Sequence, residues 1–284
     1  MISSSTNADV AVVREFGREW ARFDQSEMPG ADHEAIFHGY FDIFPWHRLR
    51  QNAEGADIGC GSGRWARDVA KRVGRLHCVD AAADALTVAQ RNLADLNNCE
   101  FHHADLATMP LADASLDFAY CLGVLHHLPD TVAGLRSCVR KLKPGAPLLV
   151  YVYYALDNRP WWYRAIWKGA DSVRAAICRV PLTLRHRITD LIAAAVYWPL
   201  ARAAALATRL HLPAGNIPLA VYRDRSFYVM RTDALDRFGT RLEKRFTRGE
   251  LEGMMRSAGL TDITFSERMP HWVAVGYRDE VSRA

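Results

Sequence analysis

The sequence lacks the features that would place this protein across a membrane or in an oxidising compartment. Its longest uninterrupted apolar run, residues 191–201, has 11 residues and contains Pro199, well short of the roughly 17 to 25 residues of a membrane-spanning helix. Residues 1–16 show no basic segment followed by an apolar one, so no signal peptide is expected. The six cysteines form no CxxC pair, which predicts free, mostly buried thiols. The expected location is the cytoplasm.

A large excess of charge of one sign is also missing. The chain has 36 Lys and Arg against 32 Asp and Glu, a net charge of +4 in 284 residues. This balance does not indicate a nucleic-acid-binding protein. Half of the residues are hydrophobic and 24% are charged, a composition that supports an ordinary core and differs from that of disordered chains. The length suits one large α/β domain or a domain with a sizeable insertion.

From about residue 54, short apolar runs alternate with helical stretches, which is typical of a doubly wound α/β fold. The last two predicted strands are joined only by Arg268, Met269 and Pro270, and so short a connection makes an antiparallel hairpin. We therefore expect a mostly parallel seven-stranded sheet with a C-terminal antiparallel hairpin. The predicted strands begin near residue 55 and continue at 76–80, 99–105, 116–123, 146–155, 263–267 and 271–277.

The helices between these strands have recognisable ends. One helix should begin after Gly63 and run to about residue 73, and the next should run to about residue 96. Asp130 is placed to cap a helix that ends at Leu142. Thr247 and Glu250 have the spacing of a capping box, and Gly259 is predicted to end that helix.

The alternation stops between residues 156 and 245, where helical periodicity dominates and the first strand signal comes at 226–230. We therefore predict three parts. Residues 1–53, rich in aromatic side chains, form an N-terminal helical cap over one edge or the mouth of the sheet. Residues 54–155 and 246–284 form the main α/β domain. Residues 156–245 form a mainly helical insertion.

The segment ADIGCGSG, residues 56–63, carries the strongest functional signal. Glycines at 59, 61 and 63 let the backbone turn sharply off a strand and approach a ligand beside a helix N-terminus. A dinucleotide fingerprint would need a glycine where Arg64 stands, which argues against a nicotinamide cofactor. Asp80 ends the next predicted strand, where a carboxylate can accept hydrogen bonds from both hydroxyls of a ribose.

Further strand ends carry Asp105, Leu106, Leu122 and the pair His126 and His127. Ligands of open α/β sheets bind beyond the carboxyl ends of the strands. These residues and the glycine segment should therefore converge on one crevice.

With these motifs in order, residues 54–155 and 246–277 resemble the class I S-adenosylmethionine-dependent methyltransferases. The matching segments include ADIGCGSG, CVDAA, HADLATMPLADASLDFAYCLGVLHHLPD and RKLKPGAPLLVYV. The segment FGREW, residues 16–20, also resembles the start of bacterial methyltransferases of surface-polysaccharide and natural-product pathways. The resemblance implies S-adenosylmethionine as cofactor, with S-adenosylhomocysteine as its product.

The resemblance also assigns cofactor contacts. Asp57 and the Gly59 backbone would meet the methionine amino end, and Leu122 would line the methionine portion. Asp80 would bind the ribose and Ala81 would lie by the adenine. Asp105 would bond the adenine amino group, and Leu106 would offer a backbone N–H to the ring. The complete implied set is Asp57, Gly59, Cys60, Gly61, Gly63, Asp80, Ala81, Asp105, Leu106 and Leu122.

His126 and His127 are the candidate catalytic residues. A hydroxyl acceptor needs a general base, and a histidine is suited to taking its proton; in the resembled O-methyltransferases one histidine of such a pair has this role. The asparagine-proline-proline-tyrosine signature of amide and base methyltransferases is absent after the fourth strand. We therefore expect methylation of a hydroxyl of a sugar or secondary metabolite, with N- or C-methylation as the alternative.

No metal is expected. His102 and His103 are adjacent on a predicted strand, and adjacent strand residues point to opposite faces. The two histidines therefore cannot chelate one ion together.

Residues 156–215 contain nine Lys and Arg and three Asp and Glu, interleaved with tryptophan and tyrosine. This segment is interpreted as a lid over a small-molecule acceptor, with peripheral contact to the inner face of the membrane and a lipid-linked acceptor as the alternative. No nucleic-acid partner is expected. Tyr154, Tyr222 and Arg223 are the candidate acceptor contacts.

Two functions of other classes remain open at this point. A nicotinamide oxidoreductase would bind NAD(H) tightly, and a non-catalytic cofactor-binding or membrane-docking module would transfer no methyl group. The sequence defines no oligomeric state.

Overall fold

The computed structural model describes residues 7–268 and 272–280. The chain divides into two compact units. The sheet unit comprises Met1–Gln25, Phe37–Ala155 and Leu242–Ala284, and the helical unit comprises Ser26–Ile36 and Leu156–Arg241. Each unit has its own core.

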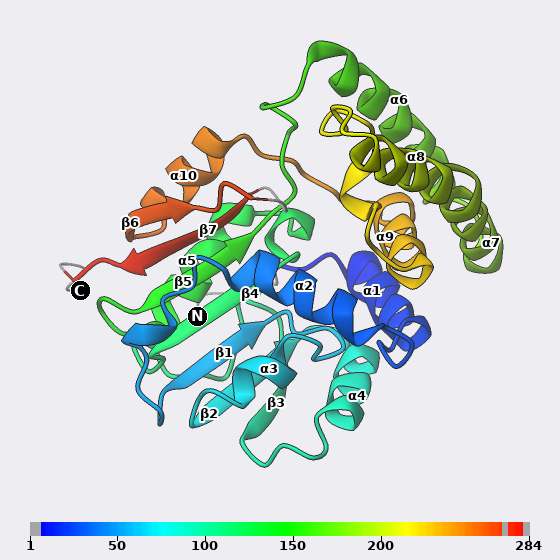
Figure 1. The fold of residues 1–284 in the computed structure, drawn as a ribbon. Coiled ribbons are helices and arrows are strands. Elements are labelled where there is room, and N and C mark those ends of the chain that lie inside the picture. Colours follow the sequence, from blue (N-terminus) through cyan, green and yellow to red (C-terminus); the bar gives the residue numbers. More distant parts are fainter. Residues whose placement is uncertain (1–6, 269–271, 281–284) are drawn as a thin grey trace. The chain divides into compact units, whose positions relative to one another are not determined.

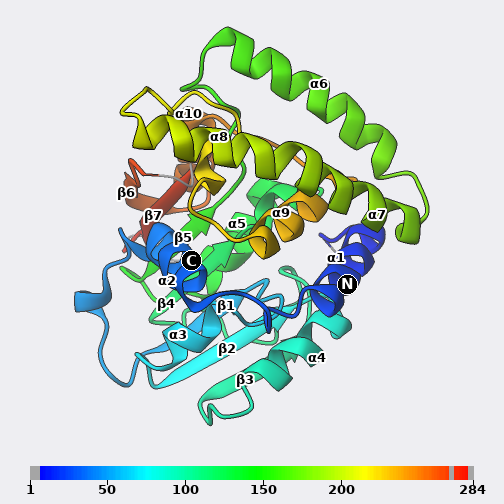
Figure 2. The ribbon, with the colours of Figure 1, turned by 45° about the vertical axis from the view of Figure 1, so that its right-hand side comes forward.

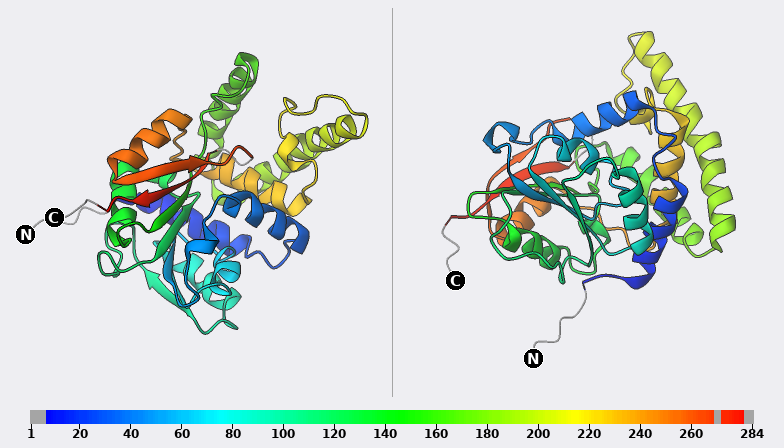
Figure 3. Two further views of the ribbon diagram at one scale, coloured as in Figure 1. Left: turned by 60° about the vertical axis from the view of Figure 1, so that its left-hand side comes forward. Right: turned by 90° about the horizontal axis from the view of Figure 1, so that it is seen from below.

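The sheet unit contains the predicted seven-stranded sheet, in the order β3-β2-β1-β4-β5-β7-β6 (Figure 1). β1 to β5 pair in parallel, and β7 is antiparallel to both β5 and β6 (Figure 3). The fold prediction is confirmed, and the connection at residues 269–271 lies outside the described residues. The strands are β1 Glu54–Ile58, β2 Arg75–Asp80, β3 Cys99–His103, β4 Phe118–Leu122, β5 Pro147–Tyr151, β6 Leu260–Phe265 and β7 Val273–Arg278.

The helices of the sheet unit begin where the capping signals predict. Asp130 accepts a hydrogen bond from the Ala133 N–H at the start of α5, and Thr247 and Glu250 form a complete capping box at the start of α10. The helix after the glycine segment is shorter than expected: α3 has five residues and ends at Ala70 rather than near 73. The helices are α1 Val10–Arg22, α3 Ala66–Ala70, α4 Ala83–Asn92, α5 Thr131–Lys141 and α10 Arg248–Ser257, with short 3-10 turns η1 Trp46–Arg48 and η2 Leu125–His127.

Aromatic residues after position 36 pack on the centre of the sheet. The ring of Phe41 meets Tyr120 of β4 edge-on at 5.2 Å, and Phe44 meets Phe118 at 5.9 Å. Phe118 and Tyr120 are fully buried. Edge-to-face geometry at this separation is the favourable arrangement of aromatic pairs, so this segment forms one wall of the sheet unit's core.

The helical unit contains six helical elements and part of α2 Gly30–Phe41, which continues into the sheet unit. The expected strand signal at 226–230 is wrong, because these residues begin α9: the Ser226 hydroxyl accepts a hydrogen bond from the Val229 N–H. Short apolar runs do not distinguish strand from buried helix, and here Met230 and Ala234 are buried one turn apart. The elements are α6 Trp161–Ile177, α7 Leu182–Ile192, the π-helical η3 Ala193–Tyr197, α8 Trp198–Arg209, η4 Ala220–Tyr222 and α9 Phe227–Gly239.

α7, η3 and α8 follow one another as a single rod of 28 residues, Leu182–Arg209 (Figure 2). By length and composition alone this stretch could cross a membrane, and 22% of its most apolar window is buried inside the protein. Single charged side chains divide this stretch, so the length of its unbroken apolar runs did not indicate that it is long enough to span a membrane. Tyr197, Ala193 and Ala201 point into the core of the helical unit, where they pack with Met230 and Ala234.

Candidate cofactor and acceptor site

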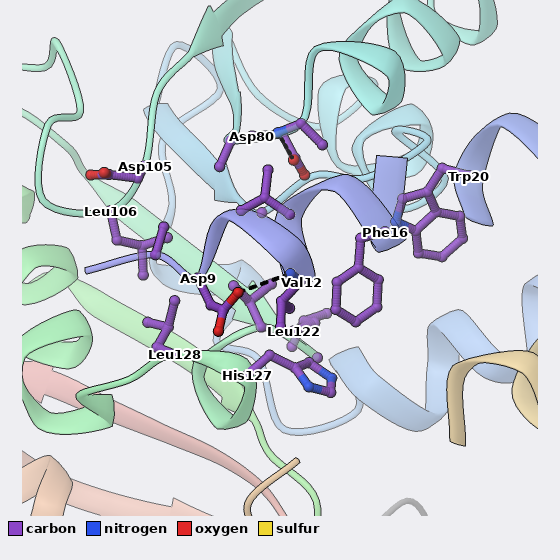
Figure 4. A pocket seen from close by; sticks show the side chains of 17 residues that line it. Asp9, Val12, Phe16, Trp20, Asp80, Asp105, Leu106, Leu122, His127 and Leu128 are labelled. Carbon is purple, nitrogen blue, oxygen red and sulfur yellow. Dashed lines mark hydrogen bonds between the residues drawn. The ribbon is translucent and has the colours of Figure 1, made fainter. Parts of the chain in front are cut away.

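A pocket lies at the carboxyl ends of β1, β2 and β4, and helix α1 forms one of its walls (Figure 4). Seven of the predicted site residues line it: Gly59, Asp80, Ala81, Asp105, Leu106, Leu122 and His127. The other lining residues are Ala8, Asp9, Val12, Val13, Phe16, Trp20, Ala82, Gly123, Val124 and Leu128. The predicted convergence of strand ends is therefore present in the structure.

Asp80 holds the glycine segment and the start of α4 together. Its Oδ2 accepts a hydrogen bond from the Gly61 N–H at 2.8 Å, and its Oδ1 accepts one from the Ala82 N–H at 2.8 Å. Burial raises the pKa of this carboxyl, and the two backbone N–H groups oppose that shift. Each carboxylate oxygen can accept more than one hydrogen bond, so Asp80 can receive ligand hydroxyls while keeping these contacts.

The glycine segment needs glycine for two separate reasons. Gly59, Gly61 and Gly63 have φ values of +80°, +54° and +73°, a region that other residues rarely adopt. A side chain at Gly59 would also place its Cβ 2.2 Å from a methyl carbon of Val124. The backbone at Gly59 therefore turns sharply and lies close to Val124, as the glycine pattern predicts.

Replacing Gly59 by Ala is expected to destabilise the ligand-free protein by about 2 to 5 kcal/mol, from left-handed backbone strain plus overpacking. Gly123→Ala is the matched control, because Gly123 also has φ +80° but open space around its Cβ. Its cost should be about 1 to 2 kcal/mol, from the backbone alone. Urea denaturation followed by tryptophan fluorescence measures both, and equal losses would show that the Val124 contact contributes nothing.

Asp57 lies under the glycine segment but does not line the pocket. It is 2% exposed, and its Oδ2 has no hydrogen-bond partner among the described residues. Burial, with a smaller contribution from the neighbouring Asp80 charge, raises the pKa of Asp57 to about 8. A cationic group bound beside this carboxyl would favour its ionised form and lower the pKa.

This shift predicts a pH dependence of stability. Between pH 4 and pH 8 the folded Asp57 holds a proton that the unfolded chain releases, so the free energy of unfolding falls as pH rises through this window. Asp57→Asn should remove this loss. Its melting temperature, relative to wild type, should therefore be higher at pH 8.5 than at pH 5.5. Calorimetry at both pH values tests this, and an equal difference at both would contradict it.

His127 lies in η2 on the pocket wall, with its ring 4.8 Å from that of Phe16. Its Nδ1 lies 2.6 Å from the carbonyl oxygen of Leu242. A carbonyl only accepts, so Nδ1 carries the proton of this hydrogen bond and Nε2 of the neutral ring carries the lone pair. This tautomer suits a general base.

His126 and His127 were both predicted to lie at the crevice, but His126 does not line the pocket. It is fully buried outside the pocket lining, between the rings of His127 and Tyr153, each 4.0 Å away. Neither ring nitrogen has a hydrogen-bond partner among the described residues. Burial, followed by the neighbouring His127 and Arg245, lowers the pKa of His126 well below its usual value. The structure therefore brings one histidine of the pair to the pocket.

Other predicted residues lie outside this pocket. Cys60, Gly61 and Gly63 belong to the glycine segment beneath it, and all of them are shielded from solvent. Tyr154 is buried against Trp272. Tyr154 therefore has a packing role in the sheet unit, and its contact with an acceptor stays a prediction.

Two further acceptor candidates belong to the helical unit. The Tyr222 hydroxyl donates a hydrogen bond to Asp233 Oδ2 at 2.7 Å, and the ring is part of the helical core. Arg223 pairs with Asp224 and lines a pocket of the helical unit that also contains Arg202. Their roles toward an acceptor likewise stay predictions.

The sequence pattern did not predict that residues of α1 line the pocket. Asp9 caps α1 by accepting hydrogen bonds from the Ala11 and Val12 N–H groups, which fixes the start of the helix at the pocket. Val12, Phe16 and Trp20 follow at four-residue spacing and all line the pocket (Figure 4). That spacing is visible in the sequence, but it indicates only an apolar helix face and not which surface the face covers.

Comparison with known proteins agrees with this geometry. Residues 56–150 match the family described as methyltransferase domain. A ubiquinone biosynthesis O-methyltransferase of Paracidovorax citrulli is 26% identical over 166 residues, covering 56% of this chain and 66% of that protein. The sterol 4-C-methyltransferase strm-1 of Caenorhabditis elegans is 30% identical over 106 residues, covering 36% of this chain and 32% of that protein. The chain thus spans less than two thirds of these relatives.

Solved structures show the same fold. The methyltransferase in a complex with the Haloferax volcanii Trm112 activator has a TM-score of 0.54 at 15% identity, covering 96% of this chain and all of that one. A possible histamine N-methyltransferase of Thermotoga maritima has a TM-score of 0.50 at 14% identity, covering 93% and 100%. Residues 56–150 therefore match a methyltransferase domain on a fold shared with solved methyltransferase structures, with S-adenosylmethionine as the methyl donor.

The residues of the sheet unit fit this cofactor. Asp80 places a carboxylate on the pocket wall, where it would accept hydrogen bonds from ribose hydroxyls. The buried Asp57 oxygen that has no partner among the described residues would be satisfied by a cationic ammonium group. Asp105 also lines the pocket, although its Oδ1 already accepts hydrogen bonds from the Ala107 and Thr108 N–H groups.

Proposed function

We propose that this protein transfers the methyl group of S-adenosylmethionine to a hydroxyl of a small molecule, with His127 as general base. The observation that carries the proposal is the hydrogen bond from His127 Nδ1–H to the Leu242 carbonyl, which turns the lone pair to Nε2 on the ring that lines the pocket. Oxygen is also the acceptor atom named for the ubiquinone biosynthesis relatives.

The chemistry needs little from the protein beyond alignment and one proton acceptor. The bound cofactor supplies a methyl group on a positively charged sulfur, which is already a good leaving group. With the cofactor bound, His127 Nε2 would take the hydroxyl proton of the acceptor as its oxygen receives the methyl group. The Leu242 carbonyl stabilises the resulting imidazolium through Nδ1–H. Val12, Phe16 and Leu122 on the pocket wall exclude water from this step.

The acceptor that we infer is apolar around its hydroxyl. Beside the acids and His127, the pocket wall is formed by aliphatic and aromatic side chains, which favour a secondary metabolite or a lipid-linked molecule over a bare sugar. Two of the relatives have names that refer to apolar compounds, ubiquinone biosynthesis and sterol 4-C-methylation.

An acceptor panel tests the proposal. Purified protein and labelled S-adenosylmethionine are incubated with phenols and quinols, with lipid-linked sugars, with free sugars and with amines of matched size. Label should appear on apolar hydroxyl compounds. Turnover of amines with no turnover of any hydroxyl compound would overturn the proposal.

We also propose peripheral membrane contact through the helical unit. Leu184, Leu191, Trp198 and Leu206 are exposed and lie seven or eight residues apart, about two helical turns, on the Leu182–Arg209 rod. Trp161 of α6 is 74% exposed. Exposed apolar side chains on basic helices are typical of segments that lie in a membrane interface.

Replacing Leu191 and Trp198 together by Glu is expected to lower binding to vesicles with anionic lipid by at least about tenfold, because each change removes apolar burial and adds repulsion. Val10→Glu is the control, since Val10 is 79% exposed in the sheet unit. Flotation should separate the two variants. If both float like wild type, or if wild type does not float, membrane contact through this rod is wrong.

A further inference from the structure

Three metal-ligating side chains meet on one face of the sheet, at its β3 edge. His77 of β2 is paired in register with Glu100 of β3, and His102 follows two residues later on the same face. His77 Nδ1 lies 3.0 Å from His102 Nε2 and 3.4 Å from Glu100 Oε2, and the three ligand atoms all lie within 4.8 Å of one another. None of these residues lines the cofactor pocket.

A fourth residue orients His77 for this arrangement. His77 Nε2 lies 2.8 Å from Glu54 Oε1 of β1. An ionised carboxylate only accepts hydrogen bonds, so Nε2 carries the proton and Nδ1 presents its lone pair toward His102 and Glu100. Metal-bound histidines in proteins are commonly held in this way, by a carboxylate on the second ring nitrogen.

We propose that His77, Glu100 and His102 form a binding site for a divalent cation of the zinc class. Ligands about 2.0 to 2.1 Å from a tetrahedral ion lie about 3.3 Å from one another, close to the two separations from His77 Nδ1. Two imidazoles and one carboxylate are the ligand types that zinc accepts in sites with one open position. His77 is 6% exposed and Glu100 is 47% exposed, so the ion would enter from the Glu100 side.

Arg75 is the positive charge that an incoming cation has to displace. Its Nε lies 3.4 Å from Glu100 Oε1, and its Nη1 lies 3.9 Å from Glu54 Oε1. The arginine side chain is 53% exposed, so it can turn into solvent at little cost. Two carboxylates face one guanidinium here, and the ion would therefore enter a site with excess negative charge.

A metal ion bound here would link the edge strand β3 to β2, whose C-terminal residue Asp80 lines the cofactor pocket. Among the strands of residues 7–268 and 272–280, β3 pairs with β2 alone, and β2 ends at Asp80. Adjacent histidines on a strand cannot share an ion, and His103 indeed lies on the other face, with its Nε2 3.0 Å from the Ala81 carbonyl. The expectation of no metal considered one strand at a time and left out the histidine that β2 places beside His102.

Metal titration of the full chain tests the site. Protein stripped with chelator is titrated with Co²⁺ by absorption and with Zn²⁺ by calorimetry. Wild type should bind one ion, His102→Gln should bind it more than about 100-fold more weakly, and Glu54→Gln, which acts through His77, roughly 10- to 100-fold more weakly. His103→Gln is the matched control and should stay within about twofold, since strand alternation turns it away.

Two further readouts separate ligation from misfolding. Zn²⁺ should raise the melting temperature of wild type and His103→Gln but not of His102→Gln, and Glu100→Gln provides a second, more exposed ligand change if His102→Gln does not fold. The Co²⁺ spectrum should show nitrogen and oxygen ligands without a thiolate charge-transfer band. Equal binding by wild type and both ligand variants, equal loss in His103→Gln, or a thiolate band would each overturn the proposal.

Discussion

Asp80→Asn is expected to weaken S-adenosylhomocysteine binding by at least about 100-fold, because hydrogen bonds to a charged group contribute about 1.5 to 3 kcal/mol each and a ribose offers two hydroxyls. The amide also retains only one acceptor oxygen, whereas Asp80 accepts from the Gly61 and Ala82 N–H groups through two. Equilibrium dialysis with labelled ligand measures the loss.

The control for this experiment is Asp84→Asn. Asp84 is an exposed carboxylate in the first turn of α4, four residues further along the chain. It should change affinity by less than about threefold, because exposed charges interact weakly through water. Equal affinity of Asp80→Asn and wild type would mean that the ribose does not bind at this strand end.

His127→Gln is expected to lower kcat by about 10² to 10⁴, the usual contribution of a general base, and to leave S-adenosylhomocysteine affinity within about threefold. A Gln side chain keeps a donor for the Leu242 carbonyl but has no basic nitrogen. The measurement is single-turnover methyl transfer across pH 6 to 9 with a hydroxyl acceptor found in the panel.

The companion variant His126→Gln decides between the two histidines. His126 is buried outside the pocket lining, so its loss should lower the melting temperature and change kcat much less than His127→Gln does. If His126→Gln abolished turnover while His127→Gln did not, the assignment of the base to His127 would be wrong.

The sheet could be predicted because its determinants are local. Buried parallel strands appear as continuous apolar runs, and caps such as Asp130 and Thr247 mark helix starts by a side chain and its spacing. The strand ends then converge because parallel strands share one direction. This reasoning brought Gly59, Asp80 and His127 to one crevice, and all three line the pocket.

The remaining features depend on contacts between distant segments. The apolar spacing in α1 predicts that one face of the helix is buried, but it does not predict which surface that face covers. The tautomer of His127 depends on Leu242, 115 positions away. The cluster around His77 exists only because pairing of β2 with β3 sets His77 beside Glu100. At residues 226–230 the short apolar run is compatible with either a strand or a helix. In the structure, Ser226 caps a helix that begins at Phe227.

Calorimetric titration of the wild-type protein, with S-adenosylhomocysteine in one series and NAD⁺ in another, tests the central claim most directly. A pocket lined by the left-handed Gly59, the Asp80 carboxylate and the α1 wall should bind one S-adenosylhomocysteine per chain and no NAD⁺. Binding of NAD⁺ without measurable heat from S-adenosylhomocysteine would contradict the account.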